Sequence, residues 1–297
     1  MKPIVFPFFD DAKLANSICE LSNFDLGKVI LHQFPDKETL VCIETDVSGR
    51  SLIFMAGLDR PNYKILPILY AAEVARELGA EDIILLAPYL PYMRQDFSFH
   101  VGEAVSSRYF AALISDYFDW LVTIDPHLHR WHMLNEIYTI PNTVLHAGQS
   151  IAEWIVTHID NPIIVGPDRE SEQWVAGIAK FNDAPYLIAD KKRHGDRKVT
   201  IEIPKLEKYV DHTPIIVDDI ISTAKTMIAA VNHVTQAGLQ TPICIGVHAI
   251  FVDGAYEELQ RTGAKIITCN TVAHASNQID LSPLMADLLN SQLFDYT

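Results

Sequence analysis

Short apolar runs alternate with segments of helical periodicity along the whole chain. In the first half, strand-like runs lie at residues 3–8, 29–33, 51–56, 82–87, 120–124 and 143–146. In the second half, they lie at residues 162–165, 184–188, 214–217, 243–249 and 265–269. The amphipathic segments between them lie at residues 63–78, 106–115, 150–158, 170–179, 226–237 and 255–263. Because strands that alternate with helices build parallel sheets covered by helices, this pattern predicts an α/β protein.

The alternation of strands and helices runs twice, with a join near residues 145–150. We therefore predict two doubly wound parallel-sheet domains of similar size, residues 1–147 and 148–297. Residues 191–209 interrupt the second run, because they are charged and contain few apolar side chains. Such an insertion is either a mobile lid over a site or a surface hairpin with solvated charges, and its composition fits both.

The segment at residues 215–226 carries the clearest chemical signal. Its apolar run ends in Asp218 and Asp219, and a helical stretch follows. The small or hydroxylated residues between them are Ser222, Thr223, Ala224 and Thr226. Free backbone N–H groups and a helix N-terminus can hold a phosphate, and the acidic pair can hold sugar hydroxyls or water on magnesium. A ribose 5-phosphate group suits this segment, but an ordinary βα turn with aspartate caps has the same pattern.

Composition narrows the class of protein further. The chain has 297 residues, of which 49% are hydrophobic and 21% charged, as in ordinary globular proteins. No apolar run is long enough for a membrane span, and the first residues do not resemble a signal peptide, so we expect a cytoplasmic protein. The net charge of −15 argues against nucleic acid as a partner. Four scattered cysteines are expected to be buried free thiols rather than a disulfide or zinc framework: Cys19, Cys42, Cys244 and Cys269.

Six short elements then match one enzyme family in the order in which that family has them. They lie at residues 34–38, 88–96, 125–127, 166–168, 190–193 and 215–226. Each element is weak alone, but together the six resemble ribose-phosphate pyrophosphokinases over nearly the whole chain. The last element also resembles the phosphoribosyl diphosphate motif of type I phosphoribosyltransferases, which lack the N-terminal half. The resemblance implies a type I phosphoribosyltransferase-like fold for both domains.

The resemblance also implies a reaction and its ligands. The diphosphoryl group of ATP would pass to the C1 hydroxyl of D-ribose 5-phosphate, giving phosphoribosyl diphosphate and AMP, with Mg²⁺ as the cofactor. The implied ATP-binding residues are Phe34, Asp36, Glu38, Arg94, Gln95 and His127. The implied ribose 5-phosphate residues are Asp218, Asp219, Ser222, Thr223, Ala224 and Thr226.

The remaining implied roles concern catalysis, metal and assembly. Lys191 and Arg193 would begin a flexible catalytic loop and stabilise the transition state, and His127 and Asp168 would place the metal. In the family, the element at residues 34–38 reaches toward the adenine of a neighbouring subunit. The resemblance therefore implies a homo-oligomer, either a dimer or a hexamer, with the N-terminal domain on the ATP side and in the oligomer contacts.

The chain departs from the family pattern in three places. Residues 169–174 replace the glycine pair that follows Pro-Asp, and we expect Glu170 and Glu172 in the first turn of a helix. Lys225 stands at a frequent glycine position and must avoid a left-handed conformation. Residues 97–100 replace basic residues. These changes keep a second hypothesis open, a catalytically silent regulatory subunit, although the retained catalytic and acidic residues favour the enzyme.

Overall fold

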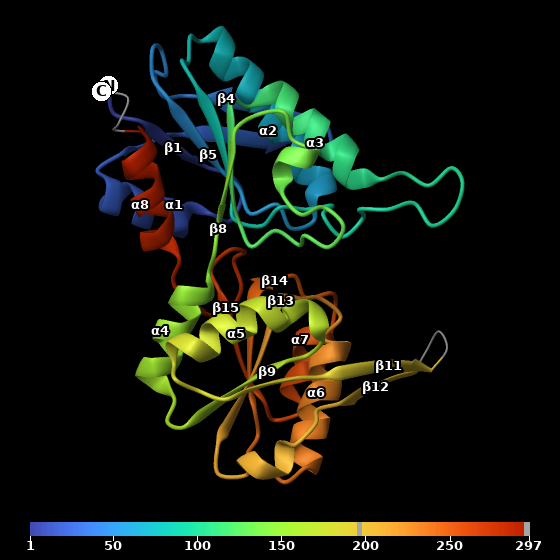
Figure 1. Cartoon of the computed structure of the whole chain (residues 1–297). Helices are drawn as coiled ribbons and strands as arrows, with labels where there is room; N and C mark the ends of the chain where they lie inside the picture. The colour runs from blue at the N-terminus through green and yellow to red at the C-terminus, as the bar shows by residue number, and fades with distance from the viewer. Residues whose placement is uncertain (195–197, 294–297) are drawn as a thin grey trace. The chain divides into compact units, whose positions relative to one another are not determined.

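The chain folds as two compact units, each built on a parallel sheet (Figure 1). A computed structural model describes residues 1–194 and 198–293, without the side chains of residues 173, 191–194, 198–201 and 293. Unit 1 comprises residues 1–145 and the C-terminal helix, and unit 2 comprises His146–Leu281. In the described part of the chain, no helix has the length and apolar character needed to cross a membrane.

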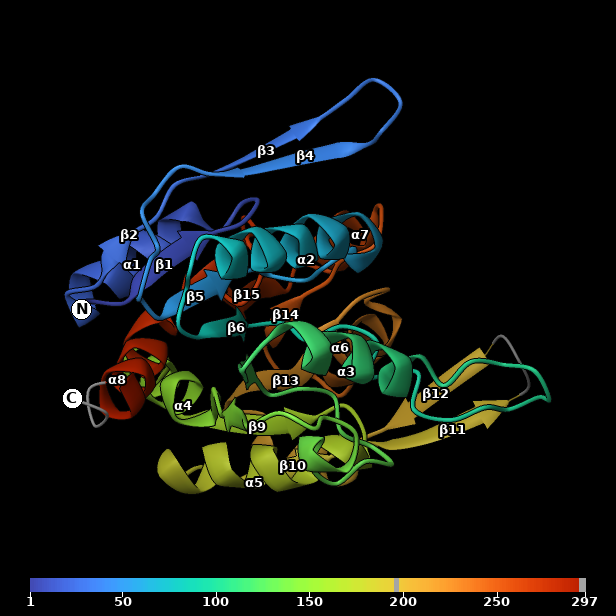
Figure 2. The same cartoon turned by 90° about the horizontal axis from the view of Figure 1, so that it is seen from above.

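Unit 1 holds a six-stranded parallel sheet in the order β2-β1-β5-β6-β7-β8. Its strands are β1 (Ile4–Pro7), β2 (Asp25–Leu26), β5 (Leu52–Met55), β6 (Ile83–Ala87), β7 (Trp120–Ile124) and β8 (Asn142–Leu145). Its helices are α1 (Ala12–Ser22), α2 (Pro61–Glu77), α3 (Ser106–Tyr117), α8 (Ser282–Leu293) and the 3₁₀ turn η1 (Leu134–Glu136). An antiparallel hairpin of β3 (Val29–Gln33) and β4 (Thr39–Ile43) projects from this unit (Figure 2).

Unit 2 repeats this plan with the strand order β10-β9-β13-β14-β15-β16. Its strands are β9 (Pro162–Gly166), β10 (Tyr186–Ile188), β13 (Thr213–Ile221), β14 (Ile243–Ala249), β15 (Lys265–Cys269) and β16 (Asn277–Ile279). Its helices are α4 (Gly148–His158), α5 (Glu172–Phe181), α6 (Lys225–Gln236) and α7 (Ala255–Gln260), with 3₁₀ turns η2 (Arg169–Ser171) and η3 (Leu206–Tyr209). A second antiparallel hairpin, β11 (Asp190–His194) with β12 (Lys198–Glu202), follows the second strand here too.

The predicted two-domain α/β architecture is confirmed, but the domain bounds differ from the predicted ones at the C-terminus. The prediction assigned residues 148–297 to the second domain, whereas α8 packs against α1 in unit 1 (Figure 1). Met285, Ala286 and Leu289 are buried, which fixes one face of this helix in the packing. The apolar pattern of α8 shows that it has a buried face, but it does not show which unit that face packs against.

Each sheet has its own apolar core, and the two cores differ in chemistry. Unit 1 is rich in aromatic rings, with centroid distances of 5.7 Å for Phe6–Phe54, 5.0 Å for Phe8–Phe54 and 6.2 Å for Phe54–Phe118. Tilted and edge-on pairs of this kind stabilise a core beyond the area that they bury. The core of unit 2 is mainly aliphatic, with Ile163, Val165, Ile216, Met227 and Val231 among its buried members.

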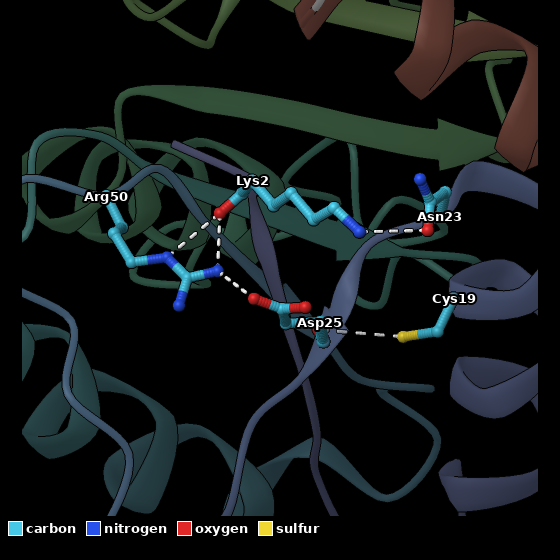
Figure 3. Close-up of polar contacts among 5 residues, drawn as sticks. All are labelled: Lys2, Cys19, Asn23, Asp25 and Arg50. Atoms are coloured by element: carbon cyan, nitrogen blue, oxygen red, sulfur yellow. Dashed lines mark hydrogen bonds and ion pairs between the residues drawn. The ribbon is translucent and has the colours of Figure 1, made fainter.

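A polar cluster secures the edge of the sheet in unit 1 (Figure 3). The Arg50 guanidinium donates to the Lys2 carbonyl at 2.9 and 2.6 Å and pairs with Asp25 on the short edge strand β2. The Lys2 ammonium donates to Asn23 Oδ1 at 2.9 Å, and Cys19 Sγ lies 3.7 Å from the Asp25 carbonyl oxygen. Because β2 has only two residues, these contacts supply what its few ladder bonds do not.

The cysteines are all free, but only two of them match the expectation of buried thiols. Cys244 and Cys269 are buried, whereas Cys42 is exposed on β4 and Cys19 is half-buried. The prediction of a buried thiol is therefore wrong for Cys42. Its strand belongs to a projecting hairpin, so alternate side chains have no sheet to pack against.

Candidate active site

The strand β13 carries the acidic pair of unit 2 and runs further than predicted. The prediction ended this strand at Val217, but β13 continues to Ile221, because Ile220 and Ile221 pair with His248 and Ala249 of β14. Gly246 opposes Asp218 in this register, and a Cβ there would lie 2.7 Å from the Ile221 side chain. The acidic pair therefore stands on a paired strand, beside a glycine that leaves room for the Ile221 side chain.

The connection from β13 to α6 is a turn of three residues, Ser222 to Ala224. Ala224 is left-handed, with φ 55° and ψ 1°, and Lys225 is the first residue of α6. The expectation that Lys225 avoids a left-handed conformation is confirmed. The first N–H groups of a helix have no partner within the helix, and they carry the positive end of its dipole. The turn thus offers donors to an anion directly beyond the acidic pair.

The carboxylates of unit 2 repel one another. Burial raises the pKa of the Asp218 carboxyl well above its ordinary value, and the charges of Asp219 and Asp168 raise it further. Asp168 follows β9, which pairs with β13, so all three carboxylates lie near the carboxyl ends of adjacent parallel strands. Charge of one sign at this edge is costly unless a cation or sugar hydroxyls share it.

The turn after β9 is the segment in which the family glycines are missing. Asp168 caps η2, because its Oδ1 accepts the Glu170 N–H at 3.1 Å, and Ser171 Oγ donates to the Asp168 carbonyl at 2.7 Å. A Cβ on Gly166 would lie 2.4 Å from Ser171 Oγ, so this glycine permits the turn. Glu170 lies in η2 and Glu172 begins α5, close to the predicted first turn, and both are exposed.

The segment predicted as a lid or a surface hairpin, residues 191–209, contains most of the β11–β12 hairpin and the turn η3. The hairpin extends from unit 2 in both views (Figures 1 and 2). The backbone of Lys191 and Arg193 lies in β11, opposite Ile201 and Val199. Their side chains lie outside the described part of the structure. The base of the hairpin is tied to η2, because the Arg169 guanidinium donates to Asp190 Oδ1 at 2.9 and 3.2 Å.

In unit 1, two predicted sets of residues follow adjacent strands. Arg94 and Gln95 lie in the β6 loop (residues 88–105), and His127 lies in the β7 loop (residues 125–133). Because β6 and β7 pair in parallel, both loops leave the same edge of the sheet. Arg94 and Gln95 are exposed and His127 is half-buried. The left-handed backbone of Asp125, at φ 35°, marks a strained turn of the kind found at functional sites.

The element at residues 34–38 forms the turn of the β3–β4 hairpin. The Phe34 N–H donates to the Glu38 carbonyl at 2.8 Å, and the Glu38 N–H donates to Asp36 Oδ1 at 3.1 Å. The Phe34 ring is 40% exposed and lies edge-on to His32 at 4.8 Å. The turn therefore presents an aromatic face to solvent, and Asp36 has at least a structural role as a turn cap.

The predicted metal residues lie in different units, His127 in unit 1 and Asp168 in unit 2. Among the described residues, no group of three or more His, Cys, Asp or Glu side chains is arranged to hold a metal ion. Magnesium needs fewer protein ligands than this, because it keeps waters and is usually held by one or two carboxylates and substrate phosphates.

Sequence reasoning did not assign roles to two polar pairs beside these residues. One is Arg169 with Asp190, described above, and the other is Asp96 with Arg130, whose closest atoms lie 2.8 Å apart. Asp96 was part of a recognised element, but nothing in its local sequence indicates a partner 34 residues away. Only the burial of a carboxylate, visible in the fold, marks it as a paired group.

The fold and these loops define an α/β protein with two domains of the phosphoribosyltransferase-like fold. Two parallel sheets bear polar loops at their carboxyl ends, and one loop joins an acidic pair to a helix N-terminus. The family model described as "Phosphoribosyl transferase domain" matches residues 133–283. The family model described as "N-terminal domain of ribose phosphate pyrophosphokinase" matches residues 4–117.

Relatives extend this match to nearly the full chain. The ribose-phosphate pyrophosphokinase of Methanobrevibacter smithii is 30% identical over 93% of this chain and 96% of its own. That of Sulfurisphaera tokodaii is 30% identical over 91% and 94%. The crystal structure of phosphoribosylpyrophosphate synthetase from Mycobacterium smegmatis covers all of both chains with a TM-score of 0.84 at 20% identity, which supports the fold.

The chain belongs to the ribose-phosphate pyrophosphokinase family. The predicted fold and the predicted enzyme class, a ribose-phosphate diphosphokinase, are confirmed. The alternative of a silent regulatory subunit is not favoured, because relatives that match over nearly the full chain are named ribose-phosphate pyrophosphokinases.

Proposed function

We propose that unit 2 binds D-ribose 5-phosphate at the β13–α6 connection. The observation that carries this assignment is the acidic pair on β13, followed by a three-residue turn and the N-terminus of α6. The 5-phosphate accepts from the backbone N–H groups of the turn and the helix, and from the hydroxyls of Ser222, Thr223 and Thr226. The sugar hydroxyls donate to Asp218 and Asp219.

ATP binds to unit 1 in this proposal. Arg94 offers a fork of donors to the phosphates, Gln95 contacts the nucleotide, and His127 lies at the phosphate end. The exposed ring of Phe34, with Asp36 and Glu38, contacts the adenine site of a neighbouring copy. The hairpin supports this reading, since its turn presents the ring to solvent rather than to its own core. A homo-oligomer, a dimer or a hexamer, follows from such sharing.

Magnesium is the proposed cofactor, and the residues present fit it. Asp168, Asp218 and Asp219 are oxygen donors whose mutual repulsion a divalent cation relieves. When bound, magnesium supplies neutralisation of the charge on the phosphoryl oxygens. His127 is assigned to the ATP-bound metal, directly or through water. This assignment assumes one or two protein ligands for each ion.

The chemistry is attack of the C1 hydroxyl oxygen on the β-phosphorus of ATP, with AMP as the leaving group. The new bond joins O1 to the β-phosphorus, the bond from the β-phosphorus to the α,β-bridging oxygen breaks, and the hydroxyl proton passes to solvent. Transfer of this kind depends mainly on alignment and on charge stabilisation. Lys191 and Arg193 on β11 are assigned the role of stabilising the negative charge that develops on the transferred phosphates. We place the reaction in the cytoplasm.

The decisive experiment measures AMP release from magnesium-ATP and ribose 5-phosphate. Activity supports the proposal, and a chain that binds both ligands without releasing AMP overturns it. Asp219→Ala then tests the sugar site by calorimetry. We expect ribose 5-phosphate to bind about ten- to a hundredfold more weakly, because charged hydrogen bonds are lost, while ATP binding changes little. Asp211→Asn is the matched control, an exposed carboxylate before β13 rather than within it. Equal weakening of both ligands by Asp219→Ala contradicts the assignment.

A further inference from the structure

The β6 and β7 loops of unit 1 are joined by a contact that no substrate role explains. Asp96 of the β6 loop accepts two hydrogen bonds from Arg130 of the β7 loop, one from the backbone N–H at 3.0 Å and one from the guanidinium at 2.8 Å. His129 Nδ1 lies 3.7 Å from the same carboxylate. The two loops carry the residues assigned to ATP, and the contacts at Asp96 link one loop to the other.

The Asp96 side chain is only 5% exposed, so its carboxylate faces the protein and not a ligand. A buried carboxylate is tolerated only when it is paired and hydrogen-bonded, and Arg130 supplies both conditions. The pair therefore exists as a unit. Removal of either member leaves the other with an unsatisfied charge in a partly buried place.

The guanidinium of Arg130 also lies over two aromatic rings. Its central carbon lies 4.7 Å from the ring centroid of Phe97 and 5.7 Å from that of Phe99. The two rings lie edge to face, 5.5 Å apart, and both belong to the β6 loop. An arginine that is hydrogen-bonded to a carboxylate and also lies over aromatic rings is restricted in orientation, because both contacts must be kept.

A second connection runs beside the first. The Ser107 N–H donates to the Gln95 carbonyl at 3.3 Å, and the indole N–H of Trp131 donates to Ser107 Oγ at 3.1 Å. Ser107 is fully buried at the start of α3. The β6 loop projects far from the sheet in both views, so it needs such anchors to keep a defined position (Figures 1 and 2).

We propose that Asp96 and Arg130 are positioning residues, which hold the β6 and β7 loops in the one arrangement that binds the triphosphate of ATP. The proposal rests on the assignment of Arg94, Gln95 and His127 to ATP. Neither Asp96 nor Arg130 needs to touch the nucleotide. Displacement of loop donors by a fraction of a bond length weakens a multidentate ligand strongly, since each donor is aligned by its support.

The molecule contains a matched control at the opposite end of the same strands. Asp119, directly before β7, accepts from Ile83 N–H of β6 at 2.8 Å and from the Arg76 guanidinium at 3.1 Å. This pair joins the same two chemical groups as the pair at the carboxyl ends, but its side chains are 36% and 40% exposed and no residue assigned to a substrate stands beside it. Arg76→Met and Asp119→Asn therefore report the cost of losing an Arg–Asp pair for stability alone.

The experiment measures Tm, kcat and the KM of both substrates for Asp96→Asn, Arg130→Met and the control variants, with calorimetry of magnesium-ATP. We expect the first two to raise the KM and Kd for magnesium-ATP about tenfold or more, with the KM for ribose 5-phosphate within about twofold. Arg130→Lys keeps the charge but not the stacking, so it should restore part of the affinity. The double variant should cost no more than the worse single one, because the two side chains share one interaction.

Two results overturn the proposal. One is a fall in Tm like that of the controls with unchanged binding of magnesium-ATP. The other is additivity of the two substitutions. Phe97→Leu, which removes only the stacking face, gives the same reading if Arg130→Met does not fold, with an expected rise in KM of about threefold. A wild-type chain that binds no magnesium-ATP refutes the ATP assignment itself, whereas unchanged variants of an active wild type refute only the positioning role.

Discussion

Asp11 makes the stability of unit 1 depend on pH, in a direction that the structure fixes. Its carboxylate is 5% exposed, and burial raises its pKa from 3.8 to about 6, although the Gly57 N–H and Lys64 act against this. Lys64 does not neutralise it fully, because its ammonium also pairs with Asp59 and donates to the Gly57 carbonyl at 2.7 Å. The folded protein thus binds the Asp11 proton more tightly than the unfolded chain does.

A group with a raised folded pKa contributes stability below its unfolded pKa, and that contribution is lost as the pH rises through the folded value. A shift of about two units at about 1.4 kcal/mol each gives about 3 kcal/mol. The loss should occur between about pH 4 and about pH 6. Asp11→Asn removes this pH dependence, because an amide does not titrate in this range. Its oxygen can still accept the Gly57 N–H, which in the wild type donates to Asp11 Oδ2 at 2.6 Å.

The assay is urea unfolding of wild type and Asp11→Asn between about pH 4 and about pH 7, compared as a difference in unfolding free energy. We expect the variant to gain on the wild type as the pH rises, by about 3 kcal/mol in total. Asp116→Asn, at an exposed carboxylate on α3, is the control and should keep a constant difference. A difference for Asp11→Asn that stays flat, or that falls as the pH rises, refutes the reasoning.

Three further predictions concern catalysis. Lys191→Ala and Arg193→Ala should each lower kcat about a hundredfold with ATP binding nearly intact, because such cations stabilise charge that develops in the transition state. Unchanged turnover of both variants would leave β11 and β12 as a surface hairpin without a catalytic role. Phe34→Ala should raise the KM for ATP by about fivefold, from a stacking loss on the order of 1 kcal/mol, and a fully active monomer in sedimentation would contradict the shared site. Glu170→Gln should change the magnesium dependence of activity while Tm changes little. An unchanged magnesium titration would mean that Glu170 has only a structural role in the η2 turn.

Much of the candidate site was visible in the sequence because its residues are close neighbours. Asp218 and Asp219 stand one after the other, and the turn and helix follow within a few positions. The conformation of Lys225 was predictable for the same reason, since one backbone position decides it. The local amino-acid sequence is sufficient where the chemistry needs only adjacent residues.

Other features of the structure depend on contacts between residues that are distant in the sequence. The length of β13 was underestimated, because Asp218 and Asp219 interrupt its apolar run, and the strand continues beyond them by pairing with β14. The pair of Asp96 and Arg130 was missed for a related reason, since the two loops meet only after β6 and β7 have paired. Cys42 was expected inside, and it lies on a projecting hairpin instead.

The sequence by itself indicated the alternation of strands and helices in both halves of the chain, and it supplied the candidate residues for phosphate, sugar and nucleotide, which stay predictions. Only the tertiary structure decided where α8 packs, how far β13 extends, and which arginine neutralises Asp96. The reason is physical. Periodicity and turn chemistry are properties of a short stretch of chain, whereas burial, strand pairing and ion pairs depend on which distant residues the fold brings within contact.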